Sequence, residues 1–351
     1  MKEIQKVPAK LKHKVEDFIV EEIGEKWICK ISKEFIPNQN PHLEILEIES
    51  QIESPKDFLL LEMEKQNIDH FQSIKNISRI LKENLEDIGY AGTKDKRAWT
   101  SQRISIFQPD LIKLKEFKHP NIILKNFKWG KRKIKIGYLE KNSFRITLRD
   151  IDKKDAIKLS SKIRSLDWFP NYFGAQRFGG NNLKVGKLLL KKRFKEAYKE
   201  ITNEEAKEDP LRELKRVGRK NMLMYINSVQ SQIFNEILKT ALEEGLDFTK
   251  KGQESCLLVG YKSRFYKGKL GQIEQEILRQ HNLTLEDFDI KEIPYLRIKG
   301  SFRKAITTVE DLKVQVEDDE EFVNSKKIIL EFTLPSGVYA TTYLDNFFIF
   351  S

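Results

Sequence analysis

The sequence contains few residues of the kinds that build metal centres or disulfide frameworks. Among 351 residues only Cys29 and Cys256 are cysteines, and the five histidines are scattered without a pair at helical ligand spacing. A disulfide scaffold or a zinc ribbon needs more cysteines at characteristic spacing. We therefore expect no metal and no disulfide.

Long apolar runs are missing as well. Hydrophobic residues make up 39% of the chain, its mean hydropathy is −0.54, and no stretch approaches the roughly 20 apolar residues of a membrane-spanning helix. Residues 1–14, MKEIQKVPAKLKHK, are basic but lack the apolar core of a signal peptide. The sequence predicts a soluble, cytoplasmic protein without a membrane partner.

Two nucleotide-binding motifs are also absent. A P-loop has four residues between its glycines and Ser or Thr after its lysine; here five residues separate Gly180 from Gly186, and Leu188 follows Lys187. The guanine-specificity element Thr/Asn-Lys-x-Asp lacks its spacer in Thr93-Lys94-Asp95. We expect no nucleotide cofactor.

Positive charge is in excess. Lysine and arginine number 64 against 53 acidic residues, a net charge of +11, and basic clusters occur at 131–133, 191–193 and 212–220. Such a balance favours a polyanionic partner. Lysine enrichment of the whole genome would produce the same excess, so charge by itself leaves both explanations open.

The expected elements change in character along the chain. Period-two patterns and turn residues predict strands, and apolar positions three and four apart predict helices. Strands are expected at 17–24, 27–33, 58–65, 103–107, 121–127, 133–137, 143–150, 256–260, 295–299 and 327–333, and helices from Asp69 to Gly89, over 152–166 and within 182–250. This order predicts an α+β fold, in which a discontinuous domain with a mixed, largely antiparallel sheet (1–194 and 306–351) is interrupted by a mostly helical α/β insertion (195–305).

The segment GYAGTKDKRA, residues 89–98, combines two glycines with one carboxylate among cations. Asp95 is flanked by Lys94 and Lys96, with Arg97 beyond. Nearby cations favour the charged form of an aspartate, which a nucleophile or base requires. A solvated turn with a fortuitous charge cluster would have the same sequence, so the residues leave both interpretations open.

The segment NYFGAQRFG, residues 171–179, packs three aromatic rings, two amides and Arg177 into nine positions. Rings can stack on a nucleobase and amides can bond its edge. Core packing explains Tyr172 and Phe178 equally well, whereas Asn171 and Phe173, near a glycine, are better candidates for a pocket.

These segments resemble the motifs of one family. GYAGTKDKRAWTSQ resembles the central motif of the TruD family of pseudouridine synthases, and NYFGAQRFG is similar to that family's second motif. The pattern Lys12-x4-Asp17-Phe18-x-Val20 resembles its N-terminal motif, and SVQSQIFN (228–235) and LPSGVYAT (334–341) resemble later ones. The resemblance runs from about residue 12 to 344 in the family's order.

The resemblance implies roles for particular residues. It places Asp95 and Lys12 in the catalytic set, with Asp95 as the carboxylate and Lys12 as its ion-pair partner. Phe18, Asn171 and Phe173 are implied to contact the substrate uridine. The discontinuous domain becomes the catalytic, pseudouridine synthase-like domain, and 195–305 becomes the family's inserted domain.

The implied reaction is the isomerisation of uridine to pseudouridine in structured RNA, most simply uridine-13 in the D-stem region of tRNA. The target base must be extruded from its stack, at a cost of a few kcal/mol. The protein is expected to act as a monomer without cofactor or metal, and Asp95 could act at C1′, at C6 or through a glycal. RNA contacts are expected from Lys94, Lys96, Arg97, Arg177, Lys131 and Arg132.

Departures from the family pattern bear on RNA docking. Asp345-Asn346 stands where the family commonly has Arg-Glu, and Gly130 and Lys141 replace its usual His and Gly. The alternative function is a non-catalytic RNA-binding or RNA-chaperone protein of the same fold, which would share the charge and aromatics without needing Asp95. A carboxylate hydrolase has less support because no second carboxylate is paired with Asp95 in the sequence.

Overall fold

The chain divides into two compact units in its computed structural model, which describes residues 5–39, 41, 44–45 and 57–350. The first unit consists of residues 1–167, 309–340 and 344–351, and the second of 168–308 and 341–343. The insertion expected at 195–305 lies inside the second unit, which begins at residue 168; as a domain assignment it stays a prediction. Residues 1–4 of the basic N-terminal segment lie outside the described residues.

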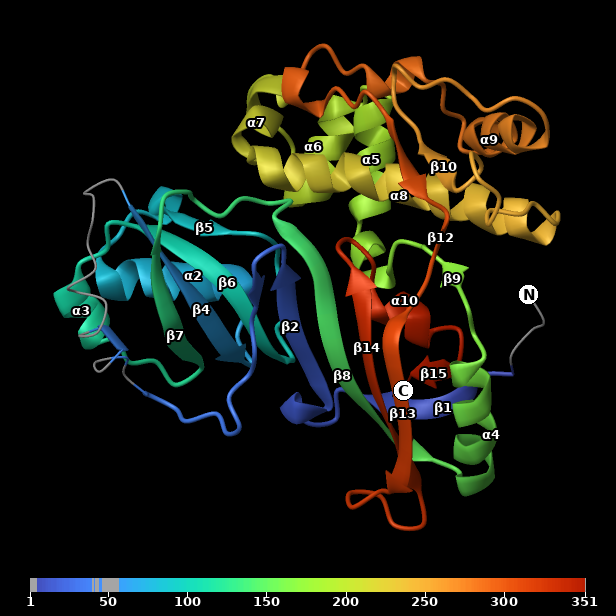
Figure 1. Cartoon of the computed structure of the whole chain (residues 1–351). Coiled ribbons are helices and arrows are strands. Elements are labelled where there is room, and N and C mark those ends of the chain that lie inside the picture. The colour runs from blue at the N-terminus through green and yellow to red at the C-terminus, as the bar shows by residue number, and fades with distance from the viewer. Residues whose placement is uncertain (1–4, 40, 42–43, 46–56, 351) are drawn as a thin grey trace. The chain divides into compact units, whose positions relative to one another are not determined.

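The first unit is built on one large mixed sheet (Figure 1), whose main path runs β13-β14-β8-β2-β6-β4-β7. Strands β2 and β6 pair in parallel, and the other neighbours on this path are antiparallel. The predicted α+β class with a mixed, largely antiparallel sheet is confirmed. The path strands are β2 (Phe18–Gly24), β4 (Phe58–Gln66), β6 (Trp99–Phe107), β7 (Ile122–Gly130), β8 (Leu139–Ile151), β13 (Glu310–Asp318) and β14 (Lys326–Pro335).

Shorter strands extend this sheet. Strand β1 pairs antiparallel with β8 and parallel with β15, β3 pairs with β2, and β5 pairs with β6. Helix α4 contacts β13, and Arg164 donates to the carbonyl of Val314 at 2.7 Å. The bounds of these strands are β1 (Val7–Leu11), β3 (Trp27–Ile28), β5 (Ile88–Tyr90) and β15 (Phe348–Phe350). Two helices of the same unit are α3 (Leu111–Lys115) and α4 (Lys153–Arg164).

Helix α2 (His70–Leu81) packs against strands β4, β6 and β7 (Figure 1). Its Ile74, Ile77 and Leu81 share one core cluster with apolar residues of β4, β6 and β7. The sequence predicts the helix start correctly, since the Asp69 side chain accepts hydrogen bonds from the first-turn amides.

The expected end of that helix at Gly89 is wrong. The helix stops at Leu81, Lys82 follows with φ of 58°, and Gly89 lies in β5. A Cβ at Gly89 would lie 2.4 Å from the carbonyl oxygen of Ile134. The glycine therefore permits a close approach of two backbones and does not terminate the helix.

The second unit is mainly helical, as the pattern over 182–250 predicts. Its strands form two pairs, β10 with β11 and β9 with β12. A strand expected at 295–299 is wrong, because a 3-10 turn (η5, Pro294–Leu296) occupies that position and β11 begins at Ser301. The remaining elements are β9 (Phe169–Pro170), α5 (Asn182–Leu190), α6 (Phe194–Thr202), α7 (Pro210–Arg216), α8 (Arg219–Glu243), β10 (Ser255–Leu258), α9 (Lys269–Gln280), β11 (Ser301–Lys304) and β12 (Ile306–Thr307).

The strand expected at 133–137 is wrong, since the Ile134 amide donates to the Ser105 side chain instead of a neighbouring strand. In the described part of the chain, every helix is too short or too polar to cross a bilayer.

Candidate active site

Asp95 lies in a loop between β5 and β6, two paired strands of the first unit, and not between a helix and a strand as the sequence suggests. The Gln102 side chain on β6 donates to the carbonyl of Gly92 at 3.2 Å. Its amide oxygen is therefore left to accept from His70 Nδ1, at 3.1 Å. The loop is thus tied to the sheet by a buried amide.

Lys12 and Asp95 form the ion pair that the family resemblance implies. Lys12 Nζ lies 2.5 Å from Asp95 Oδ2, and the two side chains are 16% and 33% exposed. The same Nζ lies 4.0 Å from the centre of the Phe18 ring, which is itself 2% exposed. A cation over a ring face is attracted to it, so Phe18 supports the lysine that holds the carboxylate.

The main chain at Lys12 adopts an unfavourable conformation, which costs free energy. Lys12 directly follows β1 and has φ of 58°, in the left-handed region. A residue with a Cβ adopts that conformation at a cost of about 1–2 kcal/mol. Non-glycine residues in such conformations cluster at functional sites, and the ion pair with Asp95 offsets part of the cost.

Lys65, which the sequence analysis missed, contacts the same loop from inside the core. It is fully buried, and its Nζ donates to the carbonyl of Asp95 at 2.6 Å and to that of Ile68 at 2.9 Å. Burial lowers the pKa of Lys65 to about 8. Asp95 is therefore held at its carboxylate by one ammonium group and at its main chain by another.

A sequence signal for Lys65 existed. Successive residues of a strand alternate between its faces, and Leu59, Leu61 and Met63 of β4 are fully buried in the cluster under α2. Lys65 occupies the next position in that period. A lysine in the apolar register of a buried strand is therefore the sequence signal that marks Lys65 as unusual.

Lys94 is placed differently from its expected RNA contact. Its Nζ pairs with Glu22 Oε1 at 2.5 Å, and the two side chains are 5% and 0% exposed. Burial raises the pKa of Glu22, and the charge of Lys94 opposes that rise. A lysine already paired in the interior has no free charge for a phosphate, which argues against the predicted contact.

Asn171, in the second unit, forms four hydrogen bonds within its own unit. Its side-chain amide donates to Lys304 O at 3.0 Å, and its Oδ1 accepts from Arg303 Nη2 at 2.6 Å. Arg303 Nε also donates to the carbonyl of Asn171, and the Asn171 amide donates to Ala305 O. This amide orders the segment after β9.

Phe173 is the neighbouring fixed group. The carboxamide of Asn235 accepts from its amide at 2.8 Å and donates to its carbonyl at 3.0 Å. The ring, 9% exposed, packs edge-on against Phe234, and the Arg303 and Arg177 guanidinium carbons lie 4.2 and 5.4 Å from its centre. Asn235 closes the motif SVQSQIFN, so that motif supports the NYFGAQRFG segment.

The structure thus groups the predicted residues into two clusters. Lys12, Phe18 and Asp95 lie together in the first unit, and Asn171 and Phe173 lie together in the second. No group of three or more His, Cys, Asp or Glu side chains within the described residues is arranged to hold a metal ion.

Of the remaining predicted RNA contacts, Lys96, Lys131 and Arg132 are exposed. Arg97 is exposed too, and its guanidinium donates to the carbonyl of His13 at 3.0 Å. Arg177 is half-buried beside the Phe173 ring.

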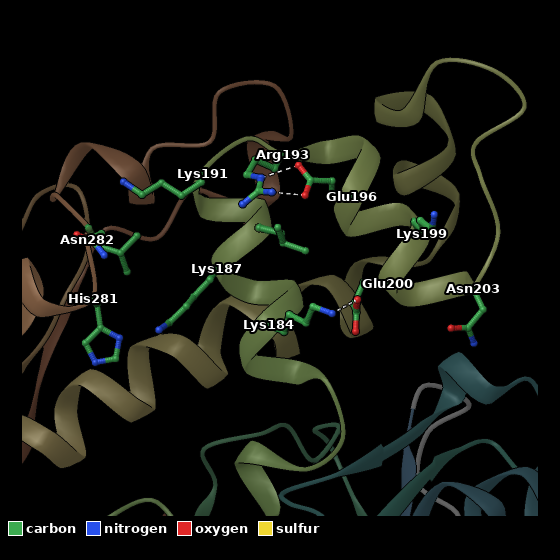
Figure 2. Close-up of a pocket in the computed structure, with 12 residues that line it drawn as sticks. Lys184, Lys187, Lys191, Arg193, Glu196, Lys199, Glu200, Asn203, His281 and Asn282 are labelled. Atoms are coloured by element: carbon green, nitrogen blue, oxygen red, sulfur yellow. Dashed lines mark hydrogen bonds and ion pairs between the residues drawn. The ribbon is translucent and has the colours of Figure 1, made fainter.

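A basic hollow of about 610 Å³ lies in the second unit, along α5, α6 and the end of α9 (Figure 2). Four of its five cations pair with carboxylates: Lys184 with Glu200, Arg193 with Glu196, Lys191 with Asp287 and Lys199 with Glu205. Lys187 is exposed, and no contact is drawn to its side chain in Figure 2. Its lining cations are Lys184, Lys187, Lys191, Arg193 and Lys199.

The departures from the family pattern have local explanations. Lys141 pairs with Glu310 at 2.5 Å. At Gly130, which ends β7, a Cβ would lie 2.7 Å from a methyl carbon of Leu60. Asp345 is exposed, and partial desolvation by its neighbours raises the pKa of its carboxyl group, an effect that the charge of Lys6 opposes.

Comparison with known proteins places the chain in one family. The sequence profile described as "tRNA pseudouridine synthase D (TruD)" matches residues 1–216 and 249–347, which omits the whole of α8. A relative from Methanosarcina acetivorans, "Probable tRNA pseudouridine synthase D", is 27% identical over 96% of this chain and 92% of its own length. "Probable tRNA pseudouridine synthase D 1" of Methanocaldococcus jannaschii is 29% identical, over 95% and 93%.

A solved structure has the same fold. A crystal structure from Methanosarcina mazei, of a protein assigned to tRNA pseudouridine synthase D (TruD), aligns with a TM-score of 0.69 over 98% of this chain and 94% of that one. The two sequences are 24% identical.

Proposed function

The chain belongs to the TruD family of tRNA pseudouridine synthases, isomerases that act on a uridine of tRNA, and we propose that Asp95 is its catalytic carboxylate and that Lys12 positions it. The observation that carries this proposal is the ion pair of 2.5 Å between the two side chains above the Phe18 ring. The ammonium group forms a charge-assisted hydrogen bond that orients the carboxylate. Its one-third exposure leaves the carboxylate accessible to a substrate.

The reaction breaks the bond between C1′ and N1 and forms one between C1′ and C5, while N1 gains the proton that C5 loses. A carboxylate can serve it in three ways: by bonding to C1′, by adding to C6, or by accepting a proton from the sugar so that a glycal forms. In each way the reacting group is an ionised Asp95. Lys12 then limits the rotation of the carboxylate and keeps it aimed at one face of the nucleoside.

Asn171 and Phe173 are proposed to hold the extruded uridine. An aromatic ring offers about 1–3 kcal/mol of stacking per base, which offsets part of the cost of unstacking the target. The proposal is supported by the rigidity of this segment, since four hydrogen bonds with Arg303, Lys304 and Asn235 fix the Asn171 side chain and the Phe173 main chain.

The RNA itself is proposed to be tRNA with uridine-13 as the target, bound in the cytoplasm by a monomeric enzyme without metal. Phosphate contacts come from exposed cations, which position RNA without reading its sequence. On the first unit these are Lys96, Arg97, Lys131 and Arg132. On the second unit the proposed exposed cation is Lys187 of the basic hollow, and the half-buried Arg177 is proposed as a further contact. We assign 195–305 of this unit to the inserted domain.

The test is to incubate the purified chain with unmodified tRNA transcripts and to map pseudouridine by carbodiimide labelling. We expect modification at uridine-13, and no product from Asp95→Asn, while that variant keeps its tRNA affinity within about threefold. Asp110→Asn is the matched control, because Asp110 also pairs with a lysine, Lys113, is 36% exposed, and lies in the same unit.

The outcomes separate the two candidate functions. Turnover by Asp95→Asn would remove that carboxylate from the mechanism. An unmutated chain that binds tRNA tightly and forms no pseudouridine on any transcript would instead establish the non-catalytic RNA-binding protein.

A further inference from the structure

We propose that Lys65 is a positioning residue for catalysis, which holds the main-chain carbonyl of Asp95 from inside the core and so fixes the direction of the carboxylate. This inference rests on the proposed role of Asp95. In this proposal Lys65 does not touch the substrate and affects the reaction only through the loop that carries Asp95.

The first support is the cost of placing Lys65 where it is. Lys65 is fully buried at the end of a row of apolar residues on β4. Burying an ammonium group costs several kcal/mol unless an opposite charge compensates it, yet Lys65 forms no ion pair with any carboxylate among the described residues. Its partners are two carbonyl oxygens. An apolar side chain of the same length would fill the position at lower cost, so core stability does not explain the lysine.

The second support is what the ammonium group holds. Asp95 is the one loop residue that Lys12 and Lys65 both contact, one at Oδ2 and the other at the main-chain oxygen. Gln102 ties the loop three residues earlier, at Gly92. Rotation of the Asp95 peptide plane would break the bond to Lys65 and swing the carboxylate. A displacement of about 1 Å at a reacting group costs on the order of 10²-fold in rate.

The protonation of Lys65 gives this role a pH signature. Burial lowers the pKa of Lys65 to about 8, so the ammonium form prevails at neutral pH and is lost above it. Burial lowers the pKa of the adjacent His70 to about 4, so that ring is neutral throughout this range. The charged groups that face Lys65 are two aspartates and two lysines, namely Asp95, Asp69, Lys94 and Lys12.

Stability and rate should respond to pH in opposite directions. The pKa of Lys65 is lower in the folded chain than in the unfolded one, so between about pH 8 and 10 the unfolded chain binds more protons. The contribution of Lys65 to the free energy of unfolding therefore rises with pH in this window. The rate falls in the same window, because the neutral amine holds the Asp95 carbonyl less strongly.

The test compares Lys65→Met with Lys327→Met in the full chain. Lys327 is the matched control, since it is 14% exposed on β14 of the same sheet and pairs with Glu317 and Glu320, remote from the loop in sequence. For Lys65→Met we expect a single-turnover rate at least 30-fold lower at pH 7, tRNA affinity within about threefold, an unchanged or higher Tm, and no decline in rate between pH 8 and 10. Lys327→Met should keep the full rate and the alkaline decline.

Any of the following results would contradict the proposal. A Lys65→Met chain that fails to fold, or that loses Tm and rate together, makes Lys65 a structural residue. A full rate in Lys65→Met, while Asp95→Asn is inactive, overturns the role of Lys65 alone. Turnover by Asp95→Asn overturns the role of Asp95, and the proposal for Lys65 with it.

Discussion

The two clusters of predicted site residues are stabilised by different kinds of interaction. Around Asp95, in the first unit, the contacts are charged: Lys12 binds the carboxylate and Lys65 binds the carbonyl. Around Phe173, in the second unit, they are mainly amide hydrogen bonds and ring packing, from Asn235 and Phe234. Asp95 remains one-third exposed, whereas Phe173 is 9% exposed.

The difference in contacts indicates which role in the reaction each cluster suits. Charged contacts orient a carboxylate while leaving it open to a substrate, and they weaken as the salt concentration rises. Amide contacts fix a backbone irrespective of pH. We therefore expect substitutions in the first cluster to change mainly the rate, and those in the second to change stability as well.

Among the residues that support Asp95 and the proposed uridine-binding segment, the largest effect should come from Lys12→Met. Removal of the ammonium group frees the carboxylate to rotate, and we expect the single-turnover rate to fall about 10²-fold with tRNA affinity almost unchanged. Lys10→Met is the control, because Lys10 lies two residues earlier on β1 and pairs with Asp150, with both side chains 38% exposed. Partial recovery in Lys12→Arg would mark a charge that positions Asp95, and equal losses in Lys10→Met and Lys12→Met would contradict it.

An intermediate effect is expected from Phe173→Leu. Leucine keeps most of the apolar volume but cannot stack on a base, and loss of about 1–2 kcal/mol of stacking lowers the rate about 10-fold. Phe248→Leu, at a ring 3% exposed in the same unit, measures the packing cost by itself. If both variants lose the same Tm and Phe173→Leu retains its rate, Phe173 is a core residue only.

The smallest effect on chemistry should follow Asn235→Ala. It leaves the amide and carbonyl of Phe173 without their partners, at a cost of about 1–3 kcal/mol, so thermal unfolding should begin several degrees lower while the rate falls only a few fold. Asn227→Ala on the same helix is the control, since no side-chain hydrogen bond of Asn227 occurs within the described residues. A large rate loss at unchanged Tm would mean that Asn235 acts on the substrate directly.

Prediction from sequence succeeded where a local pattern has one physical explanation. The strand at 58–65 alternates and is buried, and Asp69 caps the helix that follows it. It was wrong at Gly89, because that glycine pairs with Ser105 of β6 and packs against the Ile134 carbonyl, and both contacts are with residues later in the chain. It also missed Lys65: its position in an apolar strand is visible in the sequence, but the carbonyl group of Asp95 that it binds is known only from the fold.

Residue types and their order alone determined the family, the α+β class and the identity of Asp95, Lys12, Phe18, Asn171 and Phe173 as candidates, because these depend on local chemistry and motif spacing. Tertiary structure decided which charges are free. It buried Lys94 against Glu22, set Lys12 over a ring and placed Lys65 beneath the loop. Burial and distance determine whether a charge is neutralised, exposed or held against a carbonyl group, and both arise only when residues remote in the chain pack together.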